Sequence, residues 1–323
     1  MTPALETISY QPISTSERLK IAAQGNWRRF RDAWRIYSAN KLAVLGLVLL
    51  SLYTLLALLH PLLLGSVWPK NIYNPVTGFD MRVFPHPSPP SPAHLLGTDT
   101  LGRDALSILM AASGPSLVMA WTAALSAALV GTLVGAVCAY FRGAVDGVLT
   151  NLAYLVLLAP APIVMVVVGF AFDITPFQFG LIYGVLTGLG PVAIVLRSHA
   201  LTIMQRTFIE ASRITGAGAL HIMTHHLTPH LLPLAAINML LTVTGAIFAF
   251  GFIAFMGLSR AQLNWGSMIY DSFTYQAINA KITWNVLIPA SLAISLFAAS
   301  FYFIALGLQD VAEPRKKPLE RPS

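Results

Sequence analysis

Long apolar runs alternate with short polar segments along most of this chain. Six runs reach about 20 residues, the length that crosses the hydrocarbon core of a bilayer. They cover residues 42–64, 113–139, 148–172, 175–196, 231–257 and 286–308. The pattern predicts an all-α membrane protein with six transmembrane helices. The third and fourth runs almost touch along the chain, so we expect them to form a tight helical hairpin.

These runs divide the chain into segments. The sequence predicts an N-terminal tail (1–41), a first transmembrane helix (42–64), an outer loop (65–112), a five-helix core (113–308) interrupted by a polar loop (197–230), and a C-terminal tail (309–323). The first 25 residues lack the apolar stretch of a cleavable signal peptide, so the first run is expected to remain as an anchor.

Basic residues are distributed unevenly between the two sides of this topology. Of the 20 Lys and Arg residues, 15 lie in the two tails and in the segments after the second and fourth runs, and five lie in the other segments. Cytoplasmic loops are enriched in Lys and Arg. We therefore expect both termini and the polar loop in the cytoplasm.

The overall composition supports a membrane protein and argues against other classes. The chain is 56% hydrophobic and 10% charged, whereas soluble domains carry about 25% charged residues. The net charge of +7 arises in loops and tails, so no nucleic-acid partner is expected. The single cysteine, Cys138, excludes a disulfide within the chain.

Aromatic residues recur at helical spacing just before the first run, within residues 26–41. The stripe consists of Trp27, Phe30, Trp34 and Tyr37. Arg28, Arg29 and Arg35 lie off the stripe. This arrangement is typical of a helix that lies in the membrane interface with its cations near anionic lipid. The alternative is a helix that packs on its own subunit.

The outer loop contains a stiff proline-rich piece, residues 85–92, followed by an acidic and basic cluster. Asp99, Arg103 and Asp104 are close enough in sequence for Arg103 to pair with either carboxylate. A metal site is the alternative, but two carboxylates without a third ligand form a poor one.

The runs contain no Asp, Glu, Lys or Arg, which argues against a buried proton relay. A polar path through the bundle would have to use uncharged groups. The candidates are Ser116, Thr122, Asn238, Thr242 and Thr244. The alternative for each is a hydrogen bond to its own helix backbone.

The sequence offers no catalytic constellation and no phosphate-binding loop, so we expect no enzyme activity and no cofactor on this chain. His221 and His225, and likewise His226 and His230, stand four residues apart, as helical metal ligands can. No HExxH glutamate or neighbouring cysteine accompanies them, so we expect no metal site.

The polar segment between the fourth and fifth runs has helix-forming character. It contains Glu210, Ala211, Gly216, His226 and Pro229. A polar helix at this place in a membrane protein indicates contact with a partner protein.

Three motifs together carry a family resemblance. They are LGTD…GRD at residues 96–104, the Glu210-Ala211…Gly216…His226…Pro229 pattern, and FMGL…WGSM at residues 255–268. The chain resembles the permease subunits of bacterial binding-protein-dependent ABC importers, and specifically the second permease of the dipeptide, oligopeptide and nickel group.

The resemblance implies a type I importer permease fold in the bacterial inner membrane. Partners would be a homologous permease in a heterodimer, two cytoplasmic ATPase subunits that hold ATP and Mg²⁺, and an extracytoplasmic solute-binding protein. Glu210, Ala211 and Gly216 would lie on a coupling helix that docks on an ATPase, with His226 and Pro229 leading to the fifth span. Peptides are the expected cargo, and nickel chelates or oligosaccharides are alternatives.

The sequence departs from the family pattern at four positions. Ser212 replaces the usual third Ala, His230 replaces an Asn, Gly114 stands near a missing Arg, and Tyr154 stands where an Asp is usual. These changes leave the cargo open. A stand-alone channel or secondary carrier is the alternative from a different class, but such carriers usually show intramembrane charges or inverted repeats.

Overall fold

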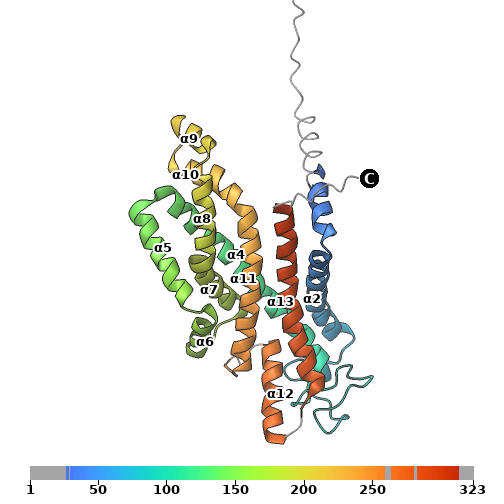
Figure 1. Ribbon diagram of the computed structural model, residues 1–323. Coiled ribbons are helices and arrows are strands. Elements are labelled where there is room, and N and C mark those ends of the chain that lie inside the picture. Colours follow the sequence, from blue (N-terminus) through green and yellow to red (C-terminus); the bar gives the residue numbers. More distant parts are fainter. Residues whose placement is uncertain (1–26, 29, 259–262, 280–281, 313–323) are drawn as a thin grey trace, which may run out of the picture.

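The computed structural model describes residues 27–28, 30–258, 263–279 and 282–312 (Figure 1). This part of the chain is a bundle of helices, and its only β-type pairing is an isolated bridge between Thr98 and Asp104. In chain order the helices are α2 (Lys41–Ser66), α3 (Lys70–Tyr73), α4 (Ala105–Phe141), α5 (Gly143–Leu158), α6 (Ala161–Ala171), α7 (Pro176–Thr187), η1 (Gly188–Val192), α8 (Ala193–Ile203), α9 (Thr207–Ile214), α10 (Ala219–His221), η2 (Ile222–Leu227), α11 (Thr228–Phe255), α12 (Trp265–Asn279) and α13 (Trp284–Ala312).

Five helical stretches in the described part are long and apolar enough to cross a membrane, and a sixth span arises if α5 and α6 are taken together. The predicted all-α architecture with up to six spans is therefore confirmed. The third apolar run, however, is not one helix, because α5 and α6 are bent by 76° at residues 159–160. Pro160 lacks the N–H that would continue the helix, and it holds the preceding Ala159 in an extended conformation.

Several helices extend beyond the apolar runs, which changes the loops that flank them. α4 begins at Ala105 because the Asp104 carboxylate caps it, accepting from the Ser107 N–H at 2.6 Å. Its first turns thus lie within the predicted outer loop 65–112. The polar loop 197–230 is also mostly helical, since α8 continues to Ile203 and the helical stretch of the next span begins at Ala219. A helix can continue past the end of an apolar run, because its backbone hydrogen bonds do not depend on apolar side chains.

The longer helices also correct the prediction that the spans carry no Asp, Glu, Lys or Arg. Asp146 lies in the first turn of α5, and Arg197 lies within α8. Both were placed in loops by the apolar pattern alone. The structure adds a helix, α12, where the sequence indicated only a loop after the fifth span.

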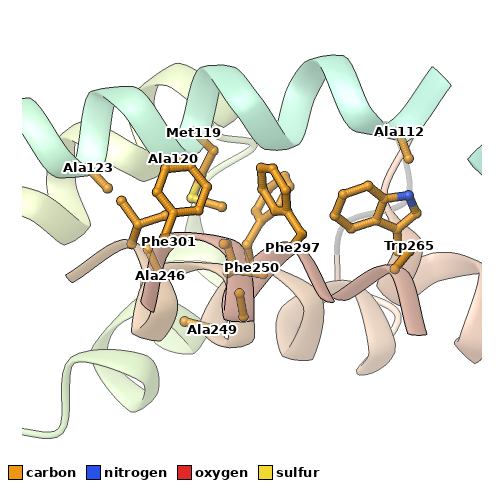
Figure 2. Close-up of a cluster of buried hydrophobic side chains, with 14 of the residues drawn as sticks. Ala112, Met119, Ala120, Ala123, Ala246, Ala249, Phe250, Trp265, Phe297 and Phe301 are labelled. Atoms are coloured by element: carbon orange, nitrogen blue, oxygen red, sulfur yellow. The ribbon is translucent and has the colours of Figure 1, made fainter. Parts of the chain in front are cut away.

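The main core lies where α4, α11, α12 and α13 meet. Figure 2 shows Phe301 beneath Ala120 and Ala123 of α4, and Trp265 beneath Ala112 of the same helix. Trp265 packs edge-to-face against Phe297, and Phe297 packs edge-to-face against Phe301. The ring centroids are 5.3 Å apart in both pairs. Small residues on one helix opposite large rings on another let the helices approach closely.

α4 and α7 approach closely along a seam of small residues. Gly180, Gly184 and Gly188 recur every fourth residue on α7 and at its end, and each faces the α4 backbone between Met119 and Ala127. A side chain at Gly180 or Gly184 would collide with that backbone, and one at Gly188 would lie in tight contact with it. The repeat follows the small-xxx-small pattern of membrane helix contacts.

A second, smaller core lies at one end of the bundle. Its buried members include Leu196 and Ala200 of α8, Ile209 of α9, Ile222 of η2 and Leu231 of α11. It is separate from the main core. It supports α9, which protrudes at the end of the molecule shown uppermost in Figure 1.

The end that carries α9 also holds the beginning of α2 and the end of α13, whereas α12 lies at the opposite end (Figure 1). Asn40, which caps α2, donates to Asp310 of α13 at 2.7 Å. The chain therefore enters and leaves the bundle on the side of the polar segment, as the distribution of basic residues predicts.

Residues 30–39 precede α2 as a helix. Trp27, Phe30 and Trp34 are exposed, but Tyr37 is buried against Gly307 of α13 and donates to the Ala43 carbonyl at 3.0 Å. The exposed aromatics suit the predicted membrane interface, and Tyr37 fits the alternative of packing on the same subunit. Asn26 and Arg29 of this predicted helix lie outside the described residues.

Candidate functional site

The predicted partner-binding segment forms a short helix, α9, held at the end of the bundle by one buried residue. Ile209 is completely buried in the second core, while Glu210, Ala211 and Arg213 are exposed and Ile214 is 86% exposed. An eight-residue helix is marginal by itself. The anchoring side chain therefore fixes α9 while most of its surface remains available.

Gly216 ends α9 in a left-handed turn. Its φ is +88°, and the Gly216 N–H donates to the Arg213 carbonyl at 3.0 Å while the Ala217 N–H donates to the Ser212 carbonyl at 3.0 Å. No atom lies within 4 Å of where a Cβ would stand. Glycine is thus required for the backbone conformation and not for a close contact within this chain.

The histidines of this segment join α9 to the span that follows. His226 Nε2 lies 3.2 Å from Ser212 Oγ, so the serine that replaces the family alanine gains a partner. The Phe208 ring stacks on His230 with 5.5 Å between centroids and contacts His226 at 5.9 Å. These contacts orient α9 relative to η2 and α11.

Among the described residues, no group of three or more His, Cys, Asp or Glu side chains is placed to hold a metal ion. The His221 and His225 rings stack at 4.4 Å, and His225 Nδ1 lies 2.8 Å from the Thr224 hydroxyl. Ring stacking and local hydrogen bonds account for their spacing.

Pro229 lies in the first turn of α11, next to the wide π-helical turn η2. A proline there has no N–H to return to the preceding turn, so the backbone widens locally before the regular span begins. His226 and Pro229 therefore lie at the joint between the polar segment and the membrane helix.

Glu210 has no ion-pair partner within 4.0 Å among the described residues, although Arg206 and Arg213 are near in sequence. Arg213 instead lies over the Tyr140 ring of α4, 5.8 Å from its centroid. The Glu210 carboxylate is thus exposed and available to a partner.

The polar residues predicted to line a path are distributed over α4 and α11 and largely bond to helix backbone. Thr122 donates to Val118, Asn238 to Leu234 and Thr242 to Asn238, all within their own helices at 2.8–2.9 Å. Thr244 reaches the Ala298 carbonyl of α13 at 3.4 Å, and Ser116 is buried. The structure does not bring these five into one polar channel within this chain.

Arg103 of the outer loop pairs with Asp99, one of its two predicted partners. Its Nε donates to Asp99 Oδ2 at 2.7 Å, and its Nη2 donates to Asp271 of α12 at 2.9 Å. Burial raises the pKa of Asp271 above its usual value, and the Arg103 charge opposes that rise. The sequence did not indicate the contact with Asp271, which lies 168 residues away.

The other candidate, Asp104, belongs to a buried cluster around His94. His94 Nδ1 lies 2.8 Å from Asp104 Oδ2, and Nε2 lies 3.4 Å from Asp80 Oδ2. Burial raises the pKa of Asp104, whereas the Arg82 N–H, which donates to Asp80 at 2.9 Å, lowers the pKa of Asp80. This cluster fastens the loop to the start of α4.

A second charge pair escaped the sequence analysis. Arg197 of α8 donates to both Asp146 oxygens, at 2.5 Å from Nε and 2.6 Å from Nη2. The two residues lie at the ends of different apolar runs and are 51 residues apart. The sequence did contain one signal for this pair. Asp146 lies just before the third apolar run, and Arg197 immediately follows the fourth.

Two residues that depart from the family pattern, Gly114 and Tyr154, have open surroundings in this chain. Gly114 has no atom within 4 Å of a would-be Cβ, and Tyr154 of α5 is 48% exposed. Neither replacement disturbs the packing of the described residues.

Apolar helices long enough to cross a membrane, together with a short polar helix exposed at one end, define a polytopic membrane protein. Comparison with known proteins gives this class a family. The chain belongs to the family of binding-protein-dependent transport system inner membrane components, whose profile matches residues 131–318. Residues 27–77 match the N-terminal transmembrane domain of oligopeptide transport permease C.

Similar curated proteins include two named peptide permeases. The dipeptide transport system permease protein DppC of Bacillus subtilis is 30% identical over 288 residues, which cover 88% of this chain and 85% of the relative. The oligopeptide transport system permease protein OppC of Haemophilus influenzae is 25% identical over 304 residues, covering 93% and 92%. The chain is thus a multi-pass inner-membrane permease subunit of an ABC importer that works with a binding protein and ATPase subunits, and the predicted family and location are confirmed.

Proposed function

We propose that this chain forms half of the translocation path of an ATP-driven importer for dipeptides or oligopeptides. A homologous permease would form the other half as a heterodimer, and a solute-binding protein would deliver cargo from outside. Two cytoplasmic ATPase subunits would hold ATP and Mg²⁺, and this chain would hydrolyse nothing and hold no cofactor. The names of its relatives support the choice of peptides.

The observation that carries the proposal is α9. This helix presents Glu210 and Ala211 on an exposed surface, while Ile209 and the Phe208 contact with His230 fix its direction. A partner that moves α9 would move the second core and, through it, the ends of α8 and α11. We infer that α9 is the coupling helix and that this end of the molecule, with both termini, faces the cytoplasm.

The test uses the complete importer with its ATPases and binding protein in vesicles. Glu210→Ala and Gly216→Val should lower peptide uptake per ATP hydrolysed, since one removes the exposed charge and the other strains the turn. Thr202→Ala is the matched control, because Thr202 is an exposed residue of the neighbouring α8 that bonds only to its own helix.

Unchanged uptake and unchanged stimulation of the ATPases in both α9 variants would refute the role of α9. Uptake by the purified chain without ATPases would identify a stand-alone channel or carrier instead. Replacing labelled peptides by nickel or by oligosaccharides in the same assay tests the cargo separately from the mechanism.

A further inference from the structure

The bent pair α5–α6 has few buried contacts with the rest of the described bundle. Ala153 is the only buried residue of α5, and Met165 is the only one of α6. Large side chains such as Val148, Leu155 and Leu158 are at least 65% exposed. Within this chain, therefore, few buried side chains hold α5–α6 to the other helices.

A charged pair joins α5 to the neighbouring helix α8. Asp146 and Arg197 form two hydrogen bonds at 2.5 and 2.6 Å, with side chains only 16% and 27% exposed. Thr150, one turn further along α5, donates to the same carboxylate at 3.1 Å. A bidentate pair between guanidinium and carboxylate fixes orientation as well as distance, which a single ammonium or an apolar contact does not.

The arginine of this pair belongs to the helix that leads to α9. α8 continues from Arg197 to Ile203, and only residues 204–206 separate it from Thr207, where α9 begins. Gly135 of α4 lies directly against the backbone of Leu196 and Arg197, so α8 is seated on α4 at this point. A displacement of α9 therefore reaches Arg197 through a short and largely helical segment.

The aspartate belongs to the helix that leads to the bend. Asp146 lies in the first turn of α5, where the helix dipole favours a carboxylate. From there α5 continues to Leu158 and meets α6 at the 76° break. A force applied at Asp146 is thus transmitted along α5 to its junction with α6.

We propose that the Asp146–Arg197 pair is the link that transmits movement of α9 to the bent pair α5–α6 during transport. This inference rests on the proposed function of α9. Asp146 and Arg197 are positioning residues, because neither needs to touch the cargo.

The test compares uptake per ATP hydrolysed in the assembled importer. Asp146→Asn and Arg197→Gln should each lower this ratio roughly ten-fold, within the usual range of coupling between sites, while ATP hydrolysis persists. The exchanged double variant, Asp146→Arg with Arg197→Asp, should recover a large part of the loss. Asn40→Ala is the matched control, because it removes the bond to Asp310 between α2 and α13 at the same end of the bundle.

A purely structural brace predicts a different result. It would lower the amount of assembled importer and leave uptake per ATP unchanged, and that outcome overturns the proposal. If the two neutral variants fail to assemble, Asp146→Glu and Arg197→Lys keep both charges and alter the bidentate geometry. A wild-type ratio in both of those variants would equally overturn it.

The assay separates this inference from the proposed function. One outcome is that the Glu210 and Gly216 variants lose coupling while the Asp146 and Arg197 variants keep it. That outcome would leave α9 as the coupling helix and refute only the role of the Asp146–Arg197 pair. Normal coupling in all four would remove both.

Discussion

Individual charged side chains in this protein join segments that lie far apart in the sequence. Arg103 connects Asp99 of the outer loop with Asp271 of α12, and the two carboxylates differ in their surroundings. Asp99 also accepts from the N–H groups of Leu101 and Arg103, at 3.0 and 2.8 Å. Among the described residues, Arg103 is the one cation within 4.0 Å of Asp271, and burial disfavours the ionised form of that carboxyl.

The two carboxylates should therefore respond differently to neutralisation. Asp99→Asn should destabilise the protein by about 1–3 kcal/mol, because an amide cannot accept all of these bonds. Asp271→Asn should be neutral or slightly stabilising at neutral pH, since it removes a charge whose burial costs more than the pairing with Arg103 returns. Thermal unfolding in detergent, with the two variants prepared in parallel, measures the difference.

The effect of Asp271 should also depend on pH. Its folded-state pKa is raised, so the folded protein takes up a proton as pH falls through that pKa, and the cost of burying the charge disappears. The stability difference between wild type and Asp271→Asn should therefore shrink at lower pH. A difference that grows on acidification would contradict the assigned direction.

Helices in this bundle meet in two ways, through closely spaced small residues and through a few buried anchors. The α4–α7 contact is of the first kind, and α9 is an example of the second. The first kind is sensitive to added atoms, because backbone cannot move aside as a flexible side chain can. The second kind is sensitive to removal of the buried side chain.

A single methyl group should disrupt the α4–α7 seam. A Cβ at Gly184 would overlap Ser126 Oγ and the Ala123 carbonyl. Gly184→Ala should thus cost about 1–3 kcal/mol through overpacking, seen as a lower unfolding temperature. Gly114→Ala is the control: it lies within α4 with open space around it and should be neutral or stabilising by about 0.5–1 kcal/mol.

Removing the anchor of α9 should release that helix and spare the bundle. Ile209→Ala removes a fully buried side chain from the second core, which is separate from the main core. Amide hydrogen exchange in residues 207–214 should accelerate, while exchange in α12, whose buried apolar residues belong to the main core, should not change. Ile214→Ala, at an 86% exposed position of the same helix, should leave exchange as in the wild type.

At the scale of the whole molecule, the polar segment and the outer loop lie at opposite ends of the bundle. α9 shares its end with the start of α2 and the end of α13, and α12 lies at the other (Figure 1). Arg103 ties the outer loop to α12, which places that loop at the end away from α9. The proposed sidedness can therefore be tested with one reporter at each end.

Cysteine labelling gives that test in a Cys138→Ser background. Ile214→Cys on α9 and Met81→Cys in the outer loop occupy positions that are 86% and 84% exposed. A membrane-impermeant thiol reagent should label Met81→Cys in intact spheroplasts and Ile214→Cys only after permeabilisation. The reverse pattern would invert the proposed topology.

The sequence alone determined the class of this protein. Apolar length predicted the spans, because a bilayer imposes a minimum run of apolar residues on each crossing. The polar segment, its Glu210 and its Gly216 were recognisable since they interrupt that pattern. Local signals of this kind do not depend on where the rest of the chain lies.

The tertiary structure alone decided the break between α5 and α6, the contact of Arg103 with Asp271 and the pairing of Asp146 with Arg197. The proline at residue 160 marked a place where a helix can bend, but its neighbours decide whether and how far it does. Charge pairs between distant residues leave no periodic signal, because they depend on which helices pack together. These contacts connect the end that a partner can reach with the helices inside the membrane.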